Sequence, residues 1–530
     1  MKVSYFVYEN IDDLECVYEH LMRTTCLANF SIAETISFIG DLDDMSHSCR
    51  KLEGLERADA LAKELLKRDL SDAELSRLYY CWANIWSDMR KLRLSCPEDD
   101  WKWDQEESEK EIVYQRMSLK YARGNEYNDD RIVDKFTNLG GHLNRVGRFF
   151  EALECWNEAL KYDSNFGMAV GNRGYGVGYF STLLFDPSHR EDYVKHAYQD
   201  MKRAIGLELN PDLRADLEYY IGEVEQRYPK DYLEGEFDFR EYPLGDSDDE
   251  IQYRKWCLNN KLFLNPMNDL FVHSVSAHDI LHLPSMIVKT GQRPPWHCFV
   301  NQMKEEFVTA RFLLYEGMHK ADTHYSDKEV ALVDSMDGSE YSINIEKVKM
   351  AFRMSYSLLD KIACFMNEYM QLGIPRRNVS LSRLWYTKCN KKNVLRNEFV
   401  KRSNLPFRGL FWLCKDFYED TPHFRNAIEP DAQELSTIRN HLEHKSFQVI
   451  NDYWGTSRNG LDRYDETDFL YRITRTDFSK RSLKLFKKVR AGLMYMLLGV
   501  SEEEKERTKE IDENKVLKMG ATIIRDDRKI

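Results

Sequence analysis

The sequence predicts an all-α fold, and three observations support this prediction. Apolar residues recur at intervals of three and four positions along nearly the whole chain, whereas alternating runs typical of half-buried strands are few. The tripeptides NLG at 138–140 and NRG at 172–174 lie 34 residues apart, which is the period of a helix–turn–helix repeat. With 530 residues, 42% of them apolar, the chain is long enough for about three to four compact units.

The first of these two repeats resembles the tetratricopeptide pattern. Five residues occupy key positions of that pattern, from the first helix through the turn to the second helix: Gly140, Gly147, Ala152, Trp156 and Ala159. Small residues let paired helices approach closely, and a large aromatic side chain fills the remaining space. The resemblance implies a tetratricopeptide-like array of helix pairs in the N-terminal part of the chain.

An acidic stretch separates this repeat region from the rest of the chain. Residues 234–250 include Pro243 and Gly245 and lack helical periodicity, as is typical of a linker. We expect four segments, in chain order: a helical repeat region at 1–235 with its clearest repeats at 133–210, an acidic hinge at 236–250, a helical domain at 251–500 and a charged tail at 501–530. The charged run that opens the tail should be solvated.

The domain at 251–500 should contain a small helical bundle. Its longest helix carries a continuous apolar stripe with alternating four- and three-residue steps: Val348, Phe352, Ser355, Leu359, Ile362, Met366 and Tyr369. A second helix is expected from about residue 430 to 447, and a third begins after residues 477–479. Together these helices suit bundle packing.

The second of these helices presents polar residues opposite its apolar face. At about 100° per residue, its apolar positions fall in one sector that must face the core: Leu435, Ile438 and Leu442. His444 points away from that sector, Asn440 lies on the same outward side, and His441 is a near neighbour. A lone helical histidine is more often structural, but an outward histidine clustered with Asn, Arg and a second His favours a functional site.

The pattern R-x4-H with Asn after the Arg, formed by Arg439, Asn440 and His444, resembles the signature of the HEPN (higher eukaryotes and prokaryotes nucleotide-binding) superfamily. The stretches at 356–363 and 265–270 also resemble a bacterial HEPN subfamily that is joined to tetratricopeptide repeats. The fold implied is an N-terminal repeat array followed by a C-terminal HEPN helical bundle.

The resemblance implies an enzyme that cleaves single-stranded RNA without a metal or any other cofactor. The ribose 2′-hydroxyl would attack the adjacent phosphate and leave a cyclic phosphate and a 5′-hydroxyl. His444 can move the proton, Arg439 can neutralise charge on the phosphoryl oxygens, and Asn440 can orient the imidazole or the phosphate. Three neighbours are candidates for supporting roles: His441, Asp360 and Lys361.

The spacing of the motif bears on the oligomeric state. Residues five apart on a helix differ by about 140° around its axis, so one helix places Arg439 and His444 on different sides. The HEPN resemblance implies a homodimer in which two copies of the motif line one cleft.

A basic segment lies between the first and second bundle helices, although the net charge of the whole chain is -13. From residue 376 to 408 only Glu398 opposes the Lys and Arg residues, and Trp385, Tyr386 and Phe407 are interleaved among them. This pattern suits phosphate contacts with base stacking, and equally a solvated surface. The candidate RNA-binding residues are Lys388, Lys391, Lys392, Arg396, Lys401 and Arg402.

Other kinds of site have weaker support. His278 and His282 could ligate zinc, but no complete ligand set has a recognisable spacing, so we expect no metal and favour a helix that packs both rings. The glycine-rich run at 174–178 resembles a phosphate loop only superficially, because no strand precedes it. The eleven cysteines never form a C-x-x-C pair, which argues against a disulfide framework.

The sequence also limits location and partners. The N-terminal residues lack a basic region followed by an apolar run, and no stretch approaches the roughly 20 apolar residues that span a bilayer. We therefore expect a cytoplasmic protein without a membrane partner.

Two functions fit these expectations. One is a toxin-like endoribonuclease in bacterial antiviral or stress defence, whose repeat array binds a protein or peptide trigger and restrains the nuclease. The other is a non-catalytic adaptor, in which the repeats bind protein and the HEPN unit dimerises or binds nucleotide. The intact Arg439, Asn440 and His444 favour the enzyme.

Overall fold

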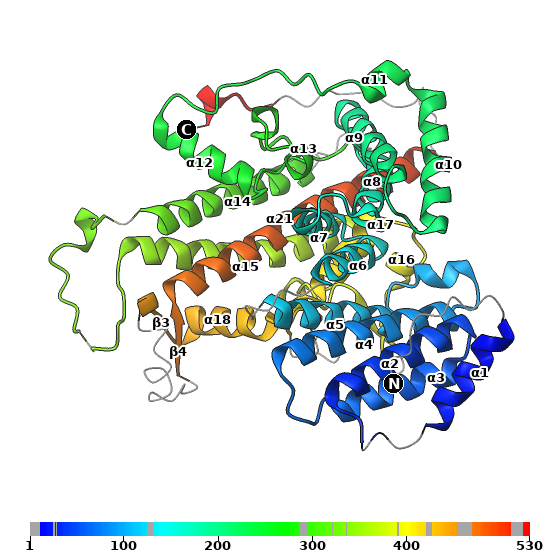
Figure 1. The fold of residues 1–530 in the computed structure, drawn as a ribbon. Helices are drawn as coiled ribbons and strands as arrows, with labels where there is room; N and C mark the ends of the chain where they lie inside the picture. The colour runs from blue at the N-terminus through cyan, green and yellow to red at the C-terminus, as the bar shows by residue number, and fades with distance from the viewer. Residues whose placement is uncertain are drawn as a thin grey trace.

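The structure is a computed structural model. It describes residues 11–24, 27, 29–123, 131–286, 295–320, 322–334, 336–389, 392–419, 427–453, 469–509 and 523–529. Helices make up most of these residues, and the strands form two two-stranded sheets, which confirms the all-α class (Figure 1). Among the described helices, none combines the length and apolar character needed to cross a membrane.

The first helices form a small bundle with a core of its own. They are α1 (Ile11–Arg23), α2 (Ile32–Ser48), α3 (Leu52–Leu65), α4 (Asp72–Arg93), the 3-10 helix η1 (Pro97–Trp101) and α5 (Glu106–Arg123). A capping box begins both α2 and α4, formed by Ser31 with Glu34 and by Ser71 with Glu74. These boxes satisfy backbone N–H groups that the helices leave unpaired at their N-termini.

Helix pairs follow, and the predicted repeats lie within them. The helices are α6 (Ile132–Arg145), α7 (Phe149–Tyr162), α8 (Gly167–Ser181), α9 (Pro187–Ile205), α10 (Pro211–Arg227) and α11 (Lys230–Glu234). Trp156 of α7 lies against two glycines: a Cβ at Gly140 would be 2.5 Å from its Nε1, and one at Gly176 would be 2.6 Å from its Cη2. The small residues therefore allow the close packing that the spacing predicted. Membership of the tetratricopeptide family stays a prediction.

The acidic segment expected to be a hinge packs against the protein. The rings of Phe237 and Phe239 lie with their centroids 4.9 and 4.8 Å from that of Phe271. Helix α12 (Asp248–Asn259) begins within the last residues of the expected hinge, because the Ser247 side chain accepts a hydrogen bond from the backbone N–H of Glu250. The segment is thus anchored on both sides of its acidic run.

The rest of the chain builds the bundle. Its elements are α12, α13 (Met267–Leu270), η2 (Ser274–Ser276), α14 (Pro295–His319), η3 (Tyr325–Asp327), α15 (Ile343–Tyr369), η4 (Arg376–Asn378), β1 (Tyr386–Cys389), β2 (Lys392–Leu395), α16 (Asn397–Val400), α17 (Leu405–Cys414), α18 (Ala432–His444), β3 (Ser446–Ile450), β4 (Leu470–Thr474), α21 (Arg475–Lys509) and η6 (Asp526–Arg528). The strands pair as β1–β2, antiparallel, and β3–β4, parallel. All seven residues of the predicted apolar stripe are buried on α15.

One hydrophobic core extends through the repeat region and the bundle. The helix α21 passes through the middle of the molecule (Figure 1), where the Tyr495 hydroxyl donates to Glu151 at 2.5 Å and accepts from the backbone N–H of Phe150 at 3.2 Å. The turn before α7 lies against α17, since a Cβ at Gly409 would be 2.2 Å from the carbonyl oxygen of Gly147. The two halves of the chain are therefore joined by extensive packing.

The expectation of a solvated charged run from residue 501 is wrong for its first part. Helix α21 continues to Lys509, and Glu503 and Glu504 are buried. Glu504 accepts a hydrogen bond of 2.7 Å from the Tyr369 hydroxyl, and Glu503 accepts one of 3.0 Å from the Asn404 side chain. These donors in the bundle satisfy the carboxylates, which allows their burial. Residues 510–522 lie outside the described part of the chain.

Candidate active site

The helix α18, called the motif helix below, carries the R-x4-H motif. Its apolar sector faces the core as predicted: Leu435, Ile438 and Leu442 are at most 5% exposed. The helix ends at His444, before the expected residue 447, because the chain continues directly into β3. Arg353 of α15 donates a hydrogen bond to the carbonyl oxygen of Leu442. This contact satisfies a carbonyl group that the end of the helix would otherwise leave unpaired.

The three motif residues are exposed on the motif helix, and one of them is braced by α15. Arg439, Asn440 and His444 all face solvent. The Arg439 guanidinium carbon lies 5.2 Å from the ring centroid of Tyr356, and a guanidinium nitrogen lies 3.6 Å from a carboxylate oxygen of Asp360. The aromatic face and the carboxylate both attract the guanidinium, so together they favour this position of the Arg439 side chain. The structure thus brings Asp360 to Arg439.

A second carboxylate, Glu419, belongs to the same neighbourhood. Its side chain accepts hydrogen bonds from Ser382 and, at 3.4 Å, from Ser380. Burial raises the pKa of Glu419, and the charge of Asp360 adds to the rise while Arg439 opposes it. Burial also raises the pKa of Asp360, again against the effect of Arg439. Sequence reasoning missed Glu419, because no local pattern links it to the motif helix.

His444 is available to a substrate or to another protein copy. Within the described part of the chain, its ring makes no hydrogen bond or ion pair, and its side chain is exposed. Arg439 lies five residues earlier, about 140° away around the helix axis. A single copy of the motif therefore does not direct both groups toward one point.

Two of the expected supporting residues do not join the motif. His441 is buried, its Nδ1 lies 2.9 Å from the carbonyl oxygen of Thr437, and its ring centroid lies 5.5 Å from that of Tyr471. Position 441 follows Ile438 by three residues and so shares the core-facing sector, which corrects its placement in the outward cluster. Lys361 forms an ion pair with Glu306 of α14 rather than approaching the motif.

The predicted RNA-binding residues lie on β1, on β2 and around α16. Lys388 on β1 and Lys401 after α16 are exposed, and Lys392 lies in β2. Lys391 falls outside the described residues. Figure 1 shows α16 well separated from α18.

Two members of that predicted set already have partners within the protein. Arg396 donates a hydrogen bond of 3.1 Å to the carbonyl oxygen of residue 384. Arg402 forms a 2.7 Å ion pair with the buried Glu503. Trp385 and Phe407 are fully buried and cannot stack on bases. The prediction of base stacking is therefore wrong for these two residues.

The expected helix around His278 and His282 is absent from the described residues. The stretch around both residues has no regular secondary structure, and the His278 ring lies against Tyr242 and the His282 ring against Phe185. No group of three or more metal-binding side chains gathers anywhere in the described residues. The glycine run at 174–178 lies inside α8, where it permits close helix packing.

Comparison with known proteins gives one family match, and it covers the segment that carries the motif. Residues 287–503 match the family model described as LA2681-like HEPN. The matched segment includes α14, α15, the motif helix and most of α21, and thus contains Arg439, Asn440 and His444. It supports placing this segment in the HEPN superfamily. No curated protein and no solved structure matches the chain.

Proposed function

We propose that this protein, whose residues 287–503 match the HEPN family, is a metal-independent endoribonuclease. The observation that carries the proposal is the exposed motif itself, with Arg439 braced by Asp360 and Tyr356 while His444 stays open to solvent. An imidazole can transfer the proton and a guanidinium can stabilise the negative charge when RNA is cleaved by an internal nucleophile.

The proposed reaction is a transesterification within the RNA strand. His444 accepts the proton of a ribose 2′-hydroxyl, and the 2′-oxygen forms a bond to the adjacent phosphorus. The bond between phosphorus and the 5′-oxygen of the next nucleotide breaks, that oxygen takes a proton from solvent to become the 5′-hydroxyl, and His444 releases to solvent the proton that it accepted. Arg439 stabilises the additional negative charge on the phosphoryl oxygens. The products are a 2′,3′-cyclic phosphate and a 5′-hydroxyl.

We further propose that two copies of the chain form the active site. Support comes from the angle between Arg439 and His444 and from exposed apolar residues near β3. The connection between α14 and α15 contacts β3 through the backbone N–H of Glu340, which donates to the carbonyl oxygen of Val449 at 2.8 Å. Val333 and Met336 in this connection are 88% and 82% exposed. Apolar side chains gathered at a surface mark interaction sites.

Complementation tests this composite site. We expect Arg439→Ala and His444→Ala homodimers to be inactive, and a refolded equal mixture to recover about a quarter of wild-type cleavage, because half the dimers would contain one intact site. The measurement is cleavage of mixed tRNA and mRNA in EDTA.

A matched control mixes His444→Ala with the double variant Arg439→Ala/His444→Ala, which offers no intact site in any pairing. Failure to recover activity, in a mixture whose subunits are shown to exchange, would disprove the two-copy site. A wild-type protein that cleaves RNA as a monomer would do the same.

The exposed lysines near β1 and α16 supply the proposed RNA-binding surface. We expect Lys388→Glu with Lys401→Glu to weaken binding of all RNA sequences and to reduce the slope of log affinity against log salt by about 1 for each lost phosphate contact. Filter binding at several salt concentrations measures the slope.

The control for this surface reverses two exposed lysines of the repeat region, Lys67→Glu with Lys161→Glu, which changes the net charge equally. The same change of slope in both double variants would show that only net charge matters. Lys388 and Lys401 would then belong to a solvated surface.

We also propose that helices α1 to α11 together, called the N-terminal array below, receive a protein or peptide trigger and that the enzyme acts as a toxin in defence. Helices α8 and α10 expose aromatic side chains: Tyr179, Tyr219 and Tyr220. Tyrosines contribute strongly to protein interfaces. Control is required because an uncontrolled RNase would damage its host, and the shared core gives the array a direct physical connection to the bundle.

A further inference from the structure

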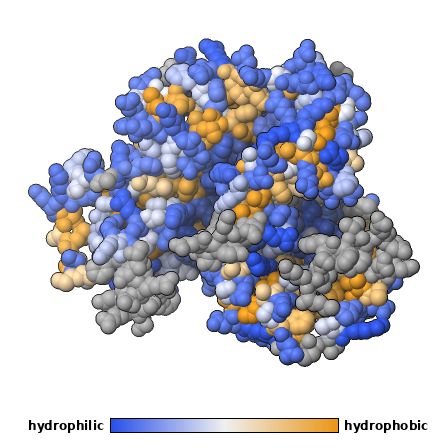
Figure 2. All heavy atoms as spheres, viewed as in Figure 1, coloured by the Kyte–Doolittle hydropathy of each residue, from blue (hydrophilic) through white to orange (hydrophobic). Residues whose placement is uncertain are grey.

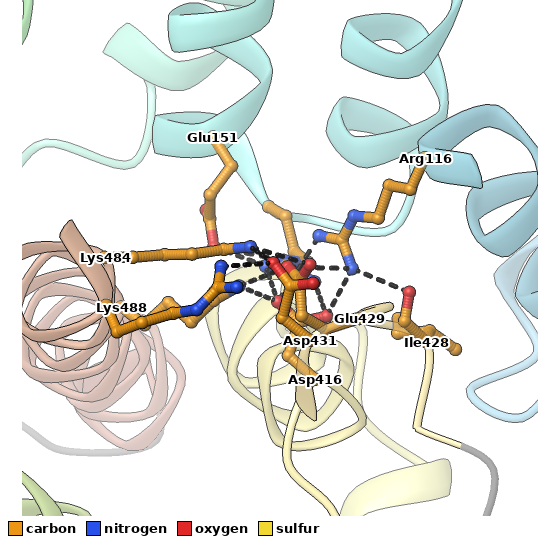
Figure 3. Close-up of polar contacts among 10 residues, drawn as sticks. Arg116, Glu151, Asp416, Ile428, Glu429, Asp431, Lys484 and Lys488 are labelled. Atoms are coloured by element: carbon orange, nitrogen blue, oxygen red, sulfur yellow. Dashed lines mark hydrogen bonds and ion pairs between the residues drawn. The ribbon is translucent and has the colours of Figure 1, made fainter. Parts of the chain in front are cut away.

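A buried cluster of charges joins the N-terminal array, the segment before the motif helix and α21. Figure 3 shows these side chains converging from three parts of the chain. The buried charge cluster consists of Arg116, Arg148, Asp416, Glu429, Lys484 and Lys488.

Asp416 is the centre of this cluster. Its carboxylate is fully buried and accepts hydrogen bonds from Arg116 of α5 at 2.6 and 3.3 Å and from Arg148 at 2.7 and 2.6 Å. Lys488 of α21 also binds it. Burial alone would raise the pKa of Asp416, but these cations hold it well below its usual value. The carboxylate is therefore charged and fixes the array against the bundle.

The same cations reach the residues that lead into the motif helix. Arg116 donates a 3.0 Å hydrogen bond to the carbonyl oxygen of Ile428. Glu429 accepts bonds from Lys484 at 2.8 Å and from Lys488 at 3.1 Å. Asp431, the residue before the motif helix, lies 3.7 Å from Lys120 of α5. The start of the motif helix is thus held from the array as well as from α21.

The local sequence does not fix this end of the helix. Asp431 occupies the N-cap position, yet its side chain makes no capping hydrogen bond. The carboxylate instead contacts Arg481 and Lys484 of α21, at 2.9 and 3.1 Å. At the other end, Arg353 binds the carbonyl oxygen of Leu442. The position of the motif helix is therefore set by long-range contacts at both ends.

Burial of such a cluster costs desolvation energy that the ion pairs recover only with good geometry. A fully apolar contact would hold the two halves together at least as well. The charged cluster in addition fixes the relative orientation of the two halves, because hydrogen bonds between charged groups require a defined geometry and apolar packing does not.

We propose that Arg116 of the N-terminal array is a positioning residue for the active site: by binding Asp416 and the carbonyl oxygen of Ile428 together, it holds the motif helix in its productive place. The inference rests on the proposed function and names the contact through which the array acts on the site. A change in the position of α5 then changes the geometry of Arg439 and His444 without touching either residue.

The test compares Arg116→Lys with a matched variant, Arg173→Lys. Arg173 also pairs through two nitrogens with a mostly buried carboxylate, Asp200, and makes one further hydrogen bond, to Asn157. Both variants keep the charge and lose the planar fork of hydrogen-bond donors. The Arg173 pair lies within the array and does not contact residues 427–431.

The first measurement is hydrogen–deuterium exchange of the motif helix in the full chain. In Arg116→Lys we expect its amides to exchange about tenfold faster, the effect of losing one charge-assisted hydrogen bond, while Arg173→Lys leaves them within about twofold of wild type. The second is cleavage kinetics, where Arg116→Lys should lower kcat about tenfold and leave KM nearly unchanged, since substrate-binding groups remain.

Equal exchange of the motif helix in the two variants would overturn the proposal, as would an unchanged kcat in a protein whose motif helix exchanges faster. If Arg116→Lys does not fold, Lys120→Gln removes the weaker contact with Asp431, and the same changes should appear at smaller size. A wild-type protein that cleaves RNA no better than His444→Ala would disprove the proposed function, whereas the exchange comparison would still decide whether Arg116 positions the helix.

Discussion

His444→Ala is expected to reduce RNA cleavage by about 10²- to 10⁴-fold, the usual contribution of a general acid or base. His444 is exposed at the end of the motif helix and has no partner among the described residues. Its replacement therefore removes the proposed proton-transfer group but should change the free energy of unfolding little. Cleavage of mixed tRNA and mRNA in EDTA measures the activity, and a thermal melt confirms that the fold is retained.

Two other histidines serve as controls for this result. His20→Ala changes an exposed histidine outside the motif and should leave cleavage intact. His441→Ala should instead lower thermal stability, because that side chain is buried and hydrogen-bonded to Thr437. Undiminished cleavage by a folded His444→Ala protein, or a strict need for added divalent metal, would contradict the assignment.

Asp416→Asn is expected to destabilise the protein by about 3–5 kcal/mol, the usual cost of removing one partner from a buried ion pair. The carboxylate is fully buried, and its loss leaves Arg116, Arg148 and Lys488 without their common anion. Urea denaturation should show a lower midpoint, and limited proteolysis should show cleavage in the array and around the motif helix together.

Asp200→Asn provides the comparison, because Asp200 pairs with Arg173 inside the array and is slightly exposed. Its substitution should cost less and leave the motif helix as protected as before. Equal losses of stability, with equal protection of the motif helix, would show that Asp416 has no special role in joining the halves. The shared core also predicts that a fragment beginning at the acidic segment exposes apolar surface, so full-length chains are the proper test material.

Much of the fold and part of the site followed from the sequence by itself. Helix periodicity is local, so the stripe on α15 and the core-facing sector of the motif helix were both predicted correctly. The same angular argument placed Asn440 and His444 on the outward side, where the structure has them. Gly140 together with Trp156 likewise predicted a closely packed helix pair, because close packing requires small residues at fixed positions.

Tertiary structure alone decided which side chains meet across long distances in the chain. Arg116 and Asp416 are 300 residues apart, and Glu419 joins Asp360 and Arg439 without any shared motif. Lys361 forms an ion pair with Glu306. Glu503 and Glu504 accept hydrogen bonds from side chains of the bundle. From the sequence alone, a charged side chain is expected to face solvent. Its burial becomes favourable only when distant elements of the fold bring a partner to it, and such long-range packing leaves no periodic pattern in the sequence.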